Sequence, residues 1–141
     1  MIENYSLKWL KKYISPDIRK AFIARPNTIY TEPLLAGIAM RETGELIERH
    51  GPLSKDELSV CSILRGDYSQ RPGETEKQYH GYGITQIDIN SFPDFVKSGK
   101  WKNPYDCFVM TIDVLEGKRK YISGKFPMLW GPDLIEYVVA A

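Results

Sequence analysis

The predicted fold is built around the segment Leu34-Leu35-Ala36-Gly37-Ile38-Ala39-Met40-Arg41-Glu42-Thr43-Gly44. It lies within a longer segment, Thr31–Arg49, in which apolar residues recur three and four positions apart. That spacing places them on one face of an α-helix and predicts that this face packs into a hydrophobic core. The residues that define the face are Leu35, Ile38, Ala39 and Leu46.

Glu42 falls on the same predicted face, four positions after Ile38 and three after Ala39. A carboxylate held against apolar packing is harder to ionise, so its pKa is expected to rise. An acid that stays protonated near neutral pH can donate its proton to a leaving group. Glu42 is therefore the first candidate catalytic residue. The alternative is a structural carboxylate paired with Arg41 or another cation.

Further helices are expected along the rest of the chain. Their predicted positions are Ile2–Ile14, Asp17–Ala24, part of Ser54–Leu64, a turn at Ser91–Lys97, Asn103 to about Tyr121, and a last helix from Gly131. Thr31, Ser15 and Asn103 suit N-caps, the latter two directly before a proline. The last helix is expected to bury Leu134, Tyr137, Val138 and Ala141.

The middle of the chain has a different pattern. Gly66–Gly73 is rich in turn-forming residues, and Ile84–Asp88 is a short alternating segment typical of a strand. His80 is expected in a loop. The predicted fold class is mainly α, or α+β: a helical bundle around a central helix that carries Glu42, with a small irregular or β-hairpin middle. Residues 1–141 are expected to form a single domain.

Composition narrows the functional classes. The net charge of +1 argues against a nucleic-acid binder held mainly by phosphate contacts. No stretch approaches the roughly 20 apolar residues of a membrane span, and Met1–Lys12 lacks the pattern of a signal peptide. Cys61 and Cys107 are expected to be small core residues, and with only two histidines no metal site is predicted.

Asp67 and Asp88 join Glu42 as acidic candidates, because both lie in the glycine-containing middle region where loops present side chains to a groove. One protonated acid and one ionised carboxylate are the minimum for glycoside hydrolysis. Asp88 has the alternative role of capping the turn at Ser91, and Asp67 that of a plain turn residue.

Other side chains are suited to a sugar groove. Aromatic rings stack on the apolar faces of sugars, and Tyr68 and Tyr82 lie near the acidic segment. Gln86 and Asn90 can hydrogen-bond sugar hydroxyl or acetamido groups. The basic run Lys118–Lys120 is expected to be the solvated end of a helix, with contact to an anionic ligand as the alternative.

Two motifs carry a family resemblance. Leu34–Gly44 resembles the catalytic-helix motif of goose-type lysozymes and the related soluble lytic transglycosylases, an apolar helix followed by Ser or Arg, Glu, and Ser or Thr. Gly81-Tyr82-Gly83-Ile84-Thr85-Gln86-Ile87-Asp88 resembles their second motif, and Gly66-Asp67 resembles the Gly-Asp upstream of it. The resemblance covers roughly Leu34 to the C-terminus.

The resemblance implies a lysozyme-like fold and cleavage of the β-1,4 bond between N-acetylmuramic acid and N-acetylglucosamine in peptidoglycan. It makes Glu42 the general acid and gives Asp88 and Asp67 the role of holding or activating the water molecule. It places Gln86 and Tyr82 in the substrate groove. No cofactor is expected. The partner is the glycan strand, the site of action is extracellular or periplasmic, and the chain is expected to be a monomer.

Three outcomes stay open. Inverting hydrolysis requires the two carboxyl groups to be about 6.5–9.5 Å apart. If neither aspartate activates water, the 6-hydroxyl of the sugar attacks instead and gives 1,6-anhydro products, as in lytic transglycosylases.

The family continues its last helix into an Ala-Tyr-Asn motif, whereas this sequence ends at Ala141. A non-catalytic glycan-binding module, or a domain completed by a partner, is therefore the third possibility.

Overall fold

The computed structural model describes the backbone of residues 5–50 and 64–140, and the side chains of residues 7–49 and 64–140. Over these ranges the chain is mostly helical, with a small antiparallel sheet. The predicted mainly α or α+β class is confirmed at that level. The helix expected after Ser54 and the surroundings of Cys61 lie outside the described residues. In the described ranges, no helix is both long and apolar enough to cross a membrane.

The N-terminal helices form one nearly continuous rod of α1 (Tyr5–Trp9), the π-helical turn η1 (Leu10–Ile14) and α2 (Ser15–Ala24). The prediction that Ser15 caps a separate helix is wrong. Its backbone N–H donates to the carbonyl of Leu10, five residues back, and its hydroxyl donates to the same carbonyl at 3.3 Å. Because Pro16 has no N–H to donate, a wider π turn carries the helix past it.

The helix α3 spans Glu32–His50, close to the predicted bounds. The hydroxyl of Thr31 accepts a hydrogen bond from the backbone N–H of Leu34 at 3.4 Å, as expected for its N-cap. The buried face, however, consists of Leu35, Ala39, Thr43 and Ile47. At about 100° per residue, Glu42 lies at the edge of this face rather than within it.

The middle region forms a three-stranded antiparallel sheet in the order β1 (Arg65–Ser69), β2 (Gln78–Tyr82), β3 (Ile87–Asp88). The sequence prediction therefore erred twice here. The first half of Gly66–Gly73 is strand, and within Ile84–Asp88 only the last two residues are strand. Gly81 lies opposite both Gly66 and Asp88, which brings Gly66-Asp67 beside the second motif, Gly81–Asp88.

The second half of the chain contains α4 (Pro93–Lys97), the 3₁₀ turn η3 (Lys100–Lys102), α5 (Pro104–Lys125) and α6 (Gly131–Ala140). Asn103 caps α5 by accepting the N–H of Tyr105 at 3.0 Å, as predicted. The predicted inward residues of α5 are all buried: Cys107, Phe108, Thr111, Ile112 and Leu115.

Two predictions for these helices are wrong. In α6, Leu134 and Val138 are buried but Tyr137 is 56% exposed, and Ala141 lies outside the described residues. The basic run Lys118–Lys120 is not at a helix end, because α5 continues to Lys125.

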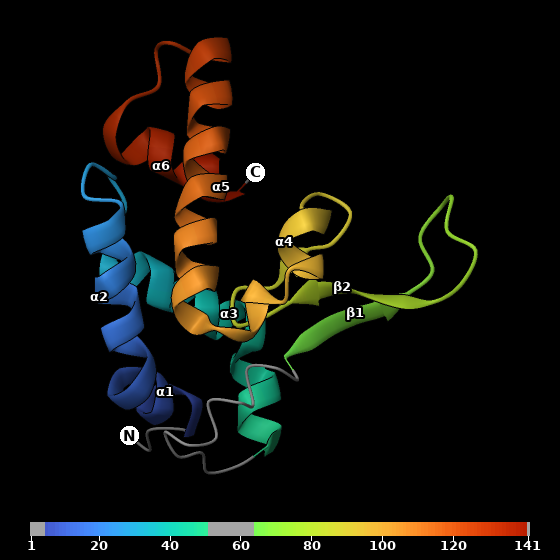
Figure 1. Cartoon of the computed structure of the whole chain (residues 1–141). Coiled ribbons are helices and arrows are strands. Elements are labelled where there is room, and N and C mark those ends of the chain that lie inside the picture. The colour runs from blue at the N-terminus through green and yellow to red at the C-terminus, as the bar shows by residue number, and fades with distance from the viewer. Residues whose placement is uncertain (1–4, 51–63, 141) are drawn as a thin grey trace.

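Figure 1 shows α5 standing at the centre of the helical part, with α2 and α6 packed against it, while the hairpin of β1 and β2 projects to one side. Helix α3 contacts α1 and α2. Cys107 is fully buried, and burial raises the pKa of its thiol to about 12, so its predicted role as a core residue is confirmed.

Candidate functional site

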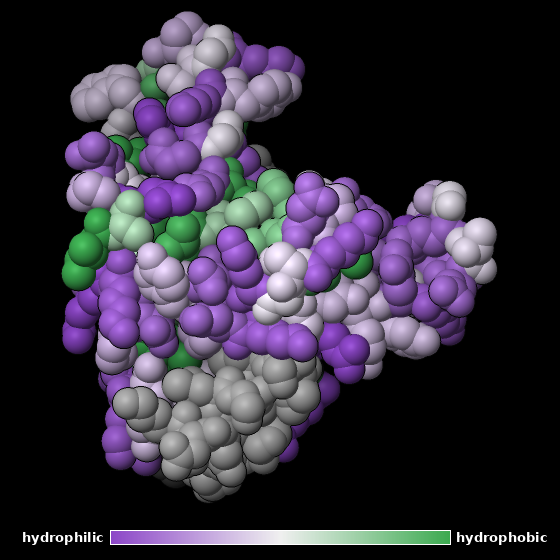
Figure 2. Space-filling view, viewed as in Figure 1, coloured by the Kyte–Doolittle hydropathy of each residue, from purple (hydrophilic) through white to green (hydrophobic). Residues whose placement is uncertain are grey.

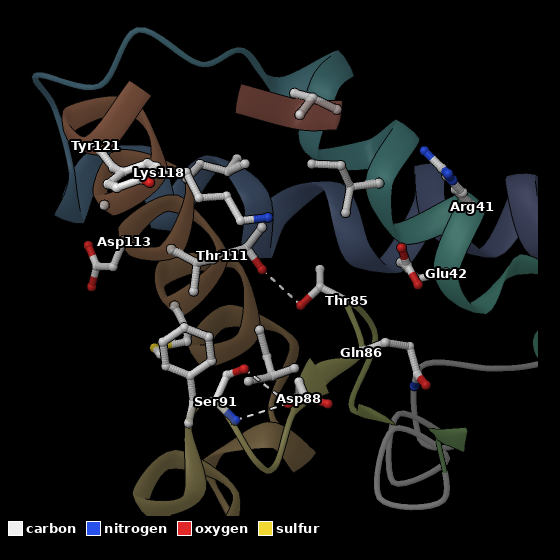
Figure 3. A pocket seen from close by; sticks show the side chains of 18 of the residues that line it. Arg41, Glu42, Thr85, Gln86, Asp88, Ser91, Thr111, Asp113, Lys118 and Tyr121 are labelled. Atoms are coloured by element: carbon white, nitrogen blue, oxygen red, sulfur yellow. Dashed lines mark hydrogen bonds between the residues drawn. The ribbon is translucent and has the colours of Figure 1, made fainter. Parts of the chain in front are cut away.

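A groove with a volume of about 740 Å³ lies between α3, the segment that includes β3, and α5. Glu42, Gln86 and Asp88 line it together, so the structure brings candidate residues of both motifs to one site (Figure 3). The lining residues are Ile38, Arg41, Glu42, Thr85, Gln86, Ile87, Asp88, Ser91, Phe92, Met110, Thr111, Asp113, Val114, Leu115, Gly117, Lys118, Tyr121, Ile122 and Val139.

Glu42 is exposed in this groove, which corrects the prediction that it packs into the apolar core. The core face of α3 was assigned from apolar residues alone, and it omitted the buried Thr43. The alternative role of Glu42 in an ion pair is not observed either. Within the described residues, its carboxylate has no hydrogen-bond or ion-pair partner, and that includes the neighbouring Arg41. A carboxyl group without a partner can accept a proton from a ligand, or donate one to it when protonated, without first breaking a hydrogen bond.

Thr43 fixes the position of the residue before it. Its side chain is fully buried, and its hydroxyl oxygen lies 2.9 Å from the carbonyl oxygens of both Ala39 and Ile84. The bond to Ile84 joins α3 to the turn between β2 and β3. Because Glu42 is adjacent to Thr43, this bond sets the distance between Glu42 and the second motif. Sequence reasoning missed the role; a threonine directly after the acid was the available signal.

The same turn is tied to α5 by a pair of threonines. The hydroxyl oxygen of Thr111 lies 2.8 Å from that of Thr85 and 2.7 Å from the carbonyl oxygen of Cys107. Both threonines are buried and line the groove (Figure 3). The turn is thus held between α3 and α5. Gly83 permits this close approach, because it has a left-handed φ of 83° and its Cα faces Cys107 and Trp101.

Asp88 lines the groove, but both of its carboxylate oxygens accept hydrogen bonds from neighbouring residues. One carboxylate oxygen accepts from the guanidinium of Arg71 at 2.8 Å. The other accepts from the backbone N–H and hydroxyl of Ser91, at 2.9 and 3.0 Å, which is the capping role considered from the sequence. Partial burial works to raise the pKa of Asp88, but Arg71 and Ser91 outweigh it, so the pKa is lowered. Asp88 is a charged and firmly positioned group.

Asp67 is not among the groove-lining residues. It lies in β1 with a left-handed φ of 51°, and its carboxylate accepts from Arg71 at 2.8 Å and from the Ser69 hydroxyl at 2.9 Å. These bonds, the Arg71 bond first, lower the pKa of Asp67. One guanidinium therefore bridges Asp67 and Asp88, and Arg71 is a second residue that sequence reasoning did not identify.

Gln86 lines the groove, but its amide nitrogen donates to the carbonyls of Gly83 at 2.9 Å and Leu64 at 3.2 Å. Its amide oxygen lies over the cross-strand pair Gly66 and Gly81, where a Cβ on either glycine would collide with it. The two glycines of the predicted motifs are therefore explained by the space that Gln86 occupies. The bonds to Gly83 and Leu64 give Gln86 a structural role in shaping the turn.

The remaining predicted substrate residues lie outside the groove lining. Tyr82 packs edge-on against Trp101 with ring centroids 5.2 Å apart. Tyr68 is 60% exposed and pairs with Tyr79 on the sheet at 4.8 Å. Asn90 donates to the Glu74 carboxylate at 3.3 Å. Their contact with substrate stays a prediction.

His80 is buried in β2, so the prediction of a loop residue is wrong. One ring nitrogen lies 2.8 Å from the carbonyl oxygen of Asp67, and the other lies 2.9 Å from both carboxylate oxygens of Glu74. Two acceptors favour the doubly protonated ring. The pKa of His80 is raised, first by the bond to the Asp67 carbonyl, against the opposing effect of burial. The backbone N–H of Arg71 is the largest cause that lowers the pKa of Glu74, to about 2.

No family model, curated protein or solved structure matched this chain in the comparisons made. Within the described ranges, no three His, Cys, Asp or Glu side chains are grouped so that they could hold a metal ion. The function is therefore inferred from the groove and its residues.

Proposed function

We propose that this chain cleaves the glycan strands of bacterial peptidoglycan, with Glu42 as the general acid. The observation that supports this most is the state of Glu42: an exposed carboxylate in the groove, without a partner in the described residues, and fixed through Thr43. The resemblance of the two motifs to goose-type lysozymes and soluble lytic transglycosylases supplies the substrate class.

In the proposed reaction, a bound glycan covers Glu42 and removes water from it, which favours the protonated acid. Glu42 then donates its proton to the glycosidic oxygen, the bond from that oxygen to C1 breaks, and positive charge develops on the sugar ring. In hydrolysis, the oxygen of a water molecule then bonds to C1, the water releases a proton to solvent, and Glu42 is reprotonated from solvent. Asp88 lines the same groove and stays ionised, so its charge stabilises the developing cation.

The second candidate is lytic transglycosylation, and it is favoured because both aspartates are bound to Arg71. Both Asp67 and Asp88 accept hydrogen bonds from Arg71 and have lowered pKa values, which makes them weak bases toward water. In this route the 6-hydroxyl of the muramic acid attacks C1, its proton returns to Glu42, and a 1,6-anhydro sugar forms. A third outcome, a glycan-binding module without turnover, follows if the groove holds the strand but Glu42 transfers no proton.

A digest of purified peptidoglycan separates these outcomes when the products are identified by mass spectrometry. The proteins compared are the wild type, Glu42→Gln, and Glu45→Gln, a matched change on the same helix outside the groove. We expect products from the wild type and Glu45→Gln but not from Glu42→Gln. Reducing-end products indicate hydrolysis and anhydro products indicate transglycosylation. A folded wild type that binds the strands but releases nothing would contradict the enzyme proposal.

A further inference from the structure

The groove has two unlike sides. Glu42, Gln86 and Asp88 are polar and lie on the side of α3 and the sheet, whereas α5 and α6 contribute mostly apolar side chains. Those apolar residues are Met110, Val114, Leu115, Ile122 and Val139. Figure 2 shows apolar surface gathered in the hollow between α5 and α4. We call these five residues, together with Lys118, the α5–α6 wall.

Lys118 is the positively charged residue of the α5–α6 wall. It is partly buried, it lines the groove, and within the described residues it has neither a hydrogen-bond nor an ion-pair partner. Figure 3 shows its side chain extending from α5 into the groove, on the side opposite Glu42. A partly buried ammonium without an anion is unfavourable, because it loses hydration and gains no partner.

The carboxylates nearest to Lys118 in the sequence of α5 are held by other residues. Asp113 accepts two bonds from the guanidinium of Arg25, at 2.8 and 2.9 Å. Glu116 accepts from Arg119 at 2.9 Å. Asp88, on the far side of the groove, is bound to Arg71. Glu42, on the opposite side of the groove, forms no ion pair with Lys118 in the described residues. The structure thus leaves Lys118 free for an anion that a ligand brings.

The wall is poorly suited to a sugar ring, whose hydroxyl groups need hydrogen-bond partners. The Thr111 hydroxyl is engaged with Thr85 and Cys107, and the Asp113 carboxylate is engaged with Arg25. Tyr121 is a further polar side chain of α5 in the lining, and the five other residues of the wall are apolar. A ligand that suits the wall carries small apolar groups and a free carboxylate. The peptide stem of peptidoglycan has both, in its alanyl methyl groups and its carboxylates.

Building on the proposed function, we infer that the α5–α6 wall binds the peptide stem of a muramyl unit, and that Lys118 pairs with a carboxylate of that stem. Lys118 is then a specificity residue. It makes the groove prefer stem-bearing strands over strands that are neutral and unbranched, because only the former supply the missing anion.

The test uses calorimetric titration of the full chain carrying Glu42→Gln, which prevents turnover. The ligands are three soluble tetrasaccharides: one of N-acetylglucosamine alone, one of alternating N-acetylglucosamine and N-acetylmuramic acid with free lactyl carboxylates, and the same sugar with tripeptide stems. We expect the stem-bearing ligand to bind about tenfold or more tightly than the neutral one, a difference of about 1.4 kcal/mol.

Lys118→Met, which keeps the length of the side chain and removes its charge, is expected to abolish that preference. Lys118→Arg is expected to keep most of it. The matched control is Lys120→Met, an exposed lysine of α5 outside the groove lining, which should leave all affinities unchanged.

Two results would overturn the inference while leaving the proposed function intact. One is equal affinity of Lys118→Met and Lys120→Met for the stem-bearing ligand. The other is a preference already complete with the free lactyl sugar, which would assign the Lys118 partner to the sugar itself. If the folded protein binds none of the three ligands, both the inference and the proposed function are wrong.

Discussion

The groove joins two regions whose acidic residues differ in their hydrogen-bond partners. On α3, Glu42 is exposed and has no partner in the described residues, and only the backbone beside it is fixed, through Thr43. On the hairpin and its neighbours, Asp67, Asp88 and Glu74 each accept several hydrogen bonds, and Arg71 contacts all three. The carboxylates of the hairpin and its neighbours take part in structural hydrogen bonds, whereas Glu42 on α3 is available to a ligand.

The difference shows that the availability of a carboxylate depends on its partners as much as on its type and spacing. Glu42 and Asp88 line the same groove, yet only Glu42 can exchange a proton without breaking an existing bond. Under the proposed function this makes Glu42 the acid and gives Asp88 an electrostatic and positioning role.

The largest expected effect is on activity. Glu42→Gln should lower the rate of peptidoglycan cleavage by about 10²- to 10⁴-fold, because it removes the proton donor. Asp88→Asn should lower it less, by about tenfold. The amide oxygen keeps the bonds from Ser91, whereas the charge and the bond accepted from Arg71 are lost. Initial rates of soluble product release measure both. Equal losses in the two variants would contradict this division of roles and make Asp88 a second proton-transfer group.

The next effect is on stability, in the turn that joins the two regions. Gly83→Ala should lower the free energy of unfolding by about 3 kcal/mol. Its φ is 83°, and a Cβ there would lie 2.5 Å from the Cys107 sulfur and 2.7 Å from the Trp101 carbonyl oxygen. Urea unfolding followed by circular dichroism measures the change.

The matched control for that change is Gly37→Ala on α3, where an added Cβ would meet nothing within 4 Å. It should raise stability by about 0.5–1 kcal/mol, because alanine is the better helix former. A loss at Gly37 similar to that at Gly83 would show that the turn is not under special constraint.

A smaller effect concerns pH, and it should be confined to the hairpin. The pKa of His80 is raised above its ordinary 6.5, so its contribution to stability is complete below pH 6.5 and is lost as pH rises through the raised value. The pKa of Glu74 is lowered from 4.5 to about 2, so its contribution is complete above pH 4.5 and is lost as pH falls toward 2. Together they contribute most between pH 4.5 and 6.5.

Nuclear magnetic resonance of the two imidazole rings measures this directly. The ring of His80 should titrate above pH 6.5 in the folded chain, and His80→Asn should flatten the decline in urea midpoint between pH 6.5 and 9. A His80 ring that titrates below 6.5 would contradict the charged bond to Glu74.

The smallest expected effect is that of Glu42→Gln on stability. Because the side chain is exposed and unpaired in the described residues, the free energy of unfolding should change by less than about 0.5 kcal/mol. Thermal unfolding of the same preparation used for activity measures it. A larger loss would reveal a structural role for Glu42 and weaken its assignment as a free acid.

Local signals in the sequence were sufficient to place the helices that frame the groove. Thr31 and Asn103 cap α3 and α5 as predicted, and the inward residues of α5 were identified from their helical spacing. These features depend on neighbours within a few positions, so periodicity and capping chemistry identify them. The short strand β1 was missed, because Gly, Asp and Ser favour turns in isolation and only pairing with β2 makes them a strand.

The residue types available at the site follow from the amino-acid sequence, whose motifs led to Glu42, Gln86 and Asp88, and these three do share one groove. What each of them is free to do depends on tertiary contacts. Arg71 reaches Asp88 across 17 positions, and Thr43 reaches Ile84 across 41. The physical reason is that a carboxylate becomes a structural bond or a free acid according to the cations and donors that folding brings to it, and those come from distant parts of the chain.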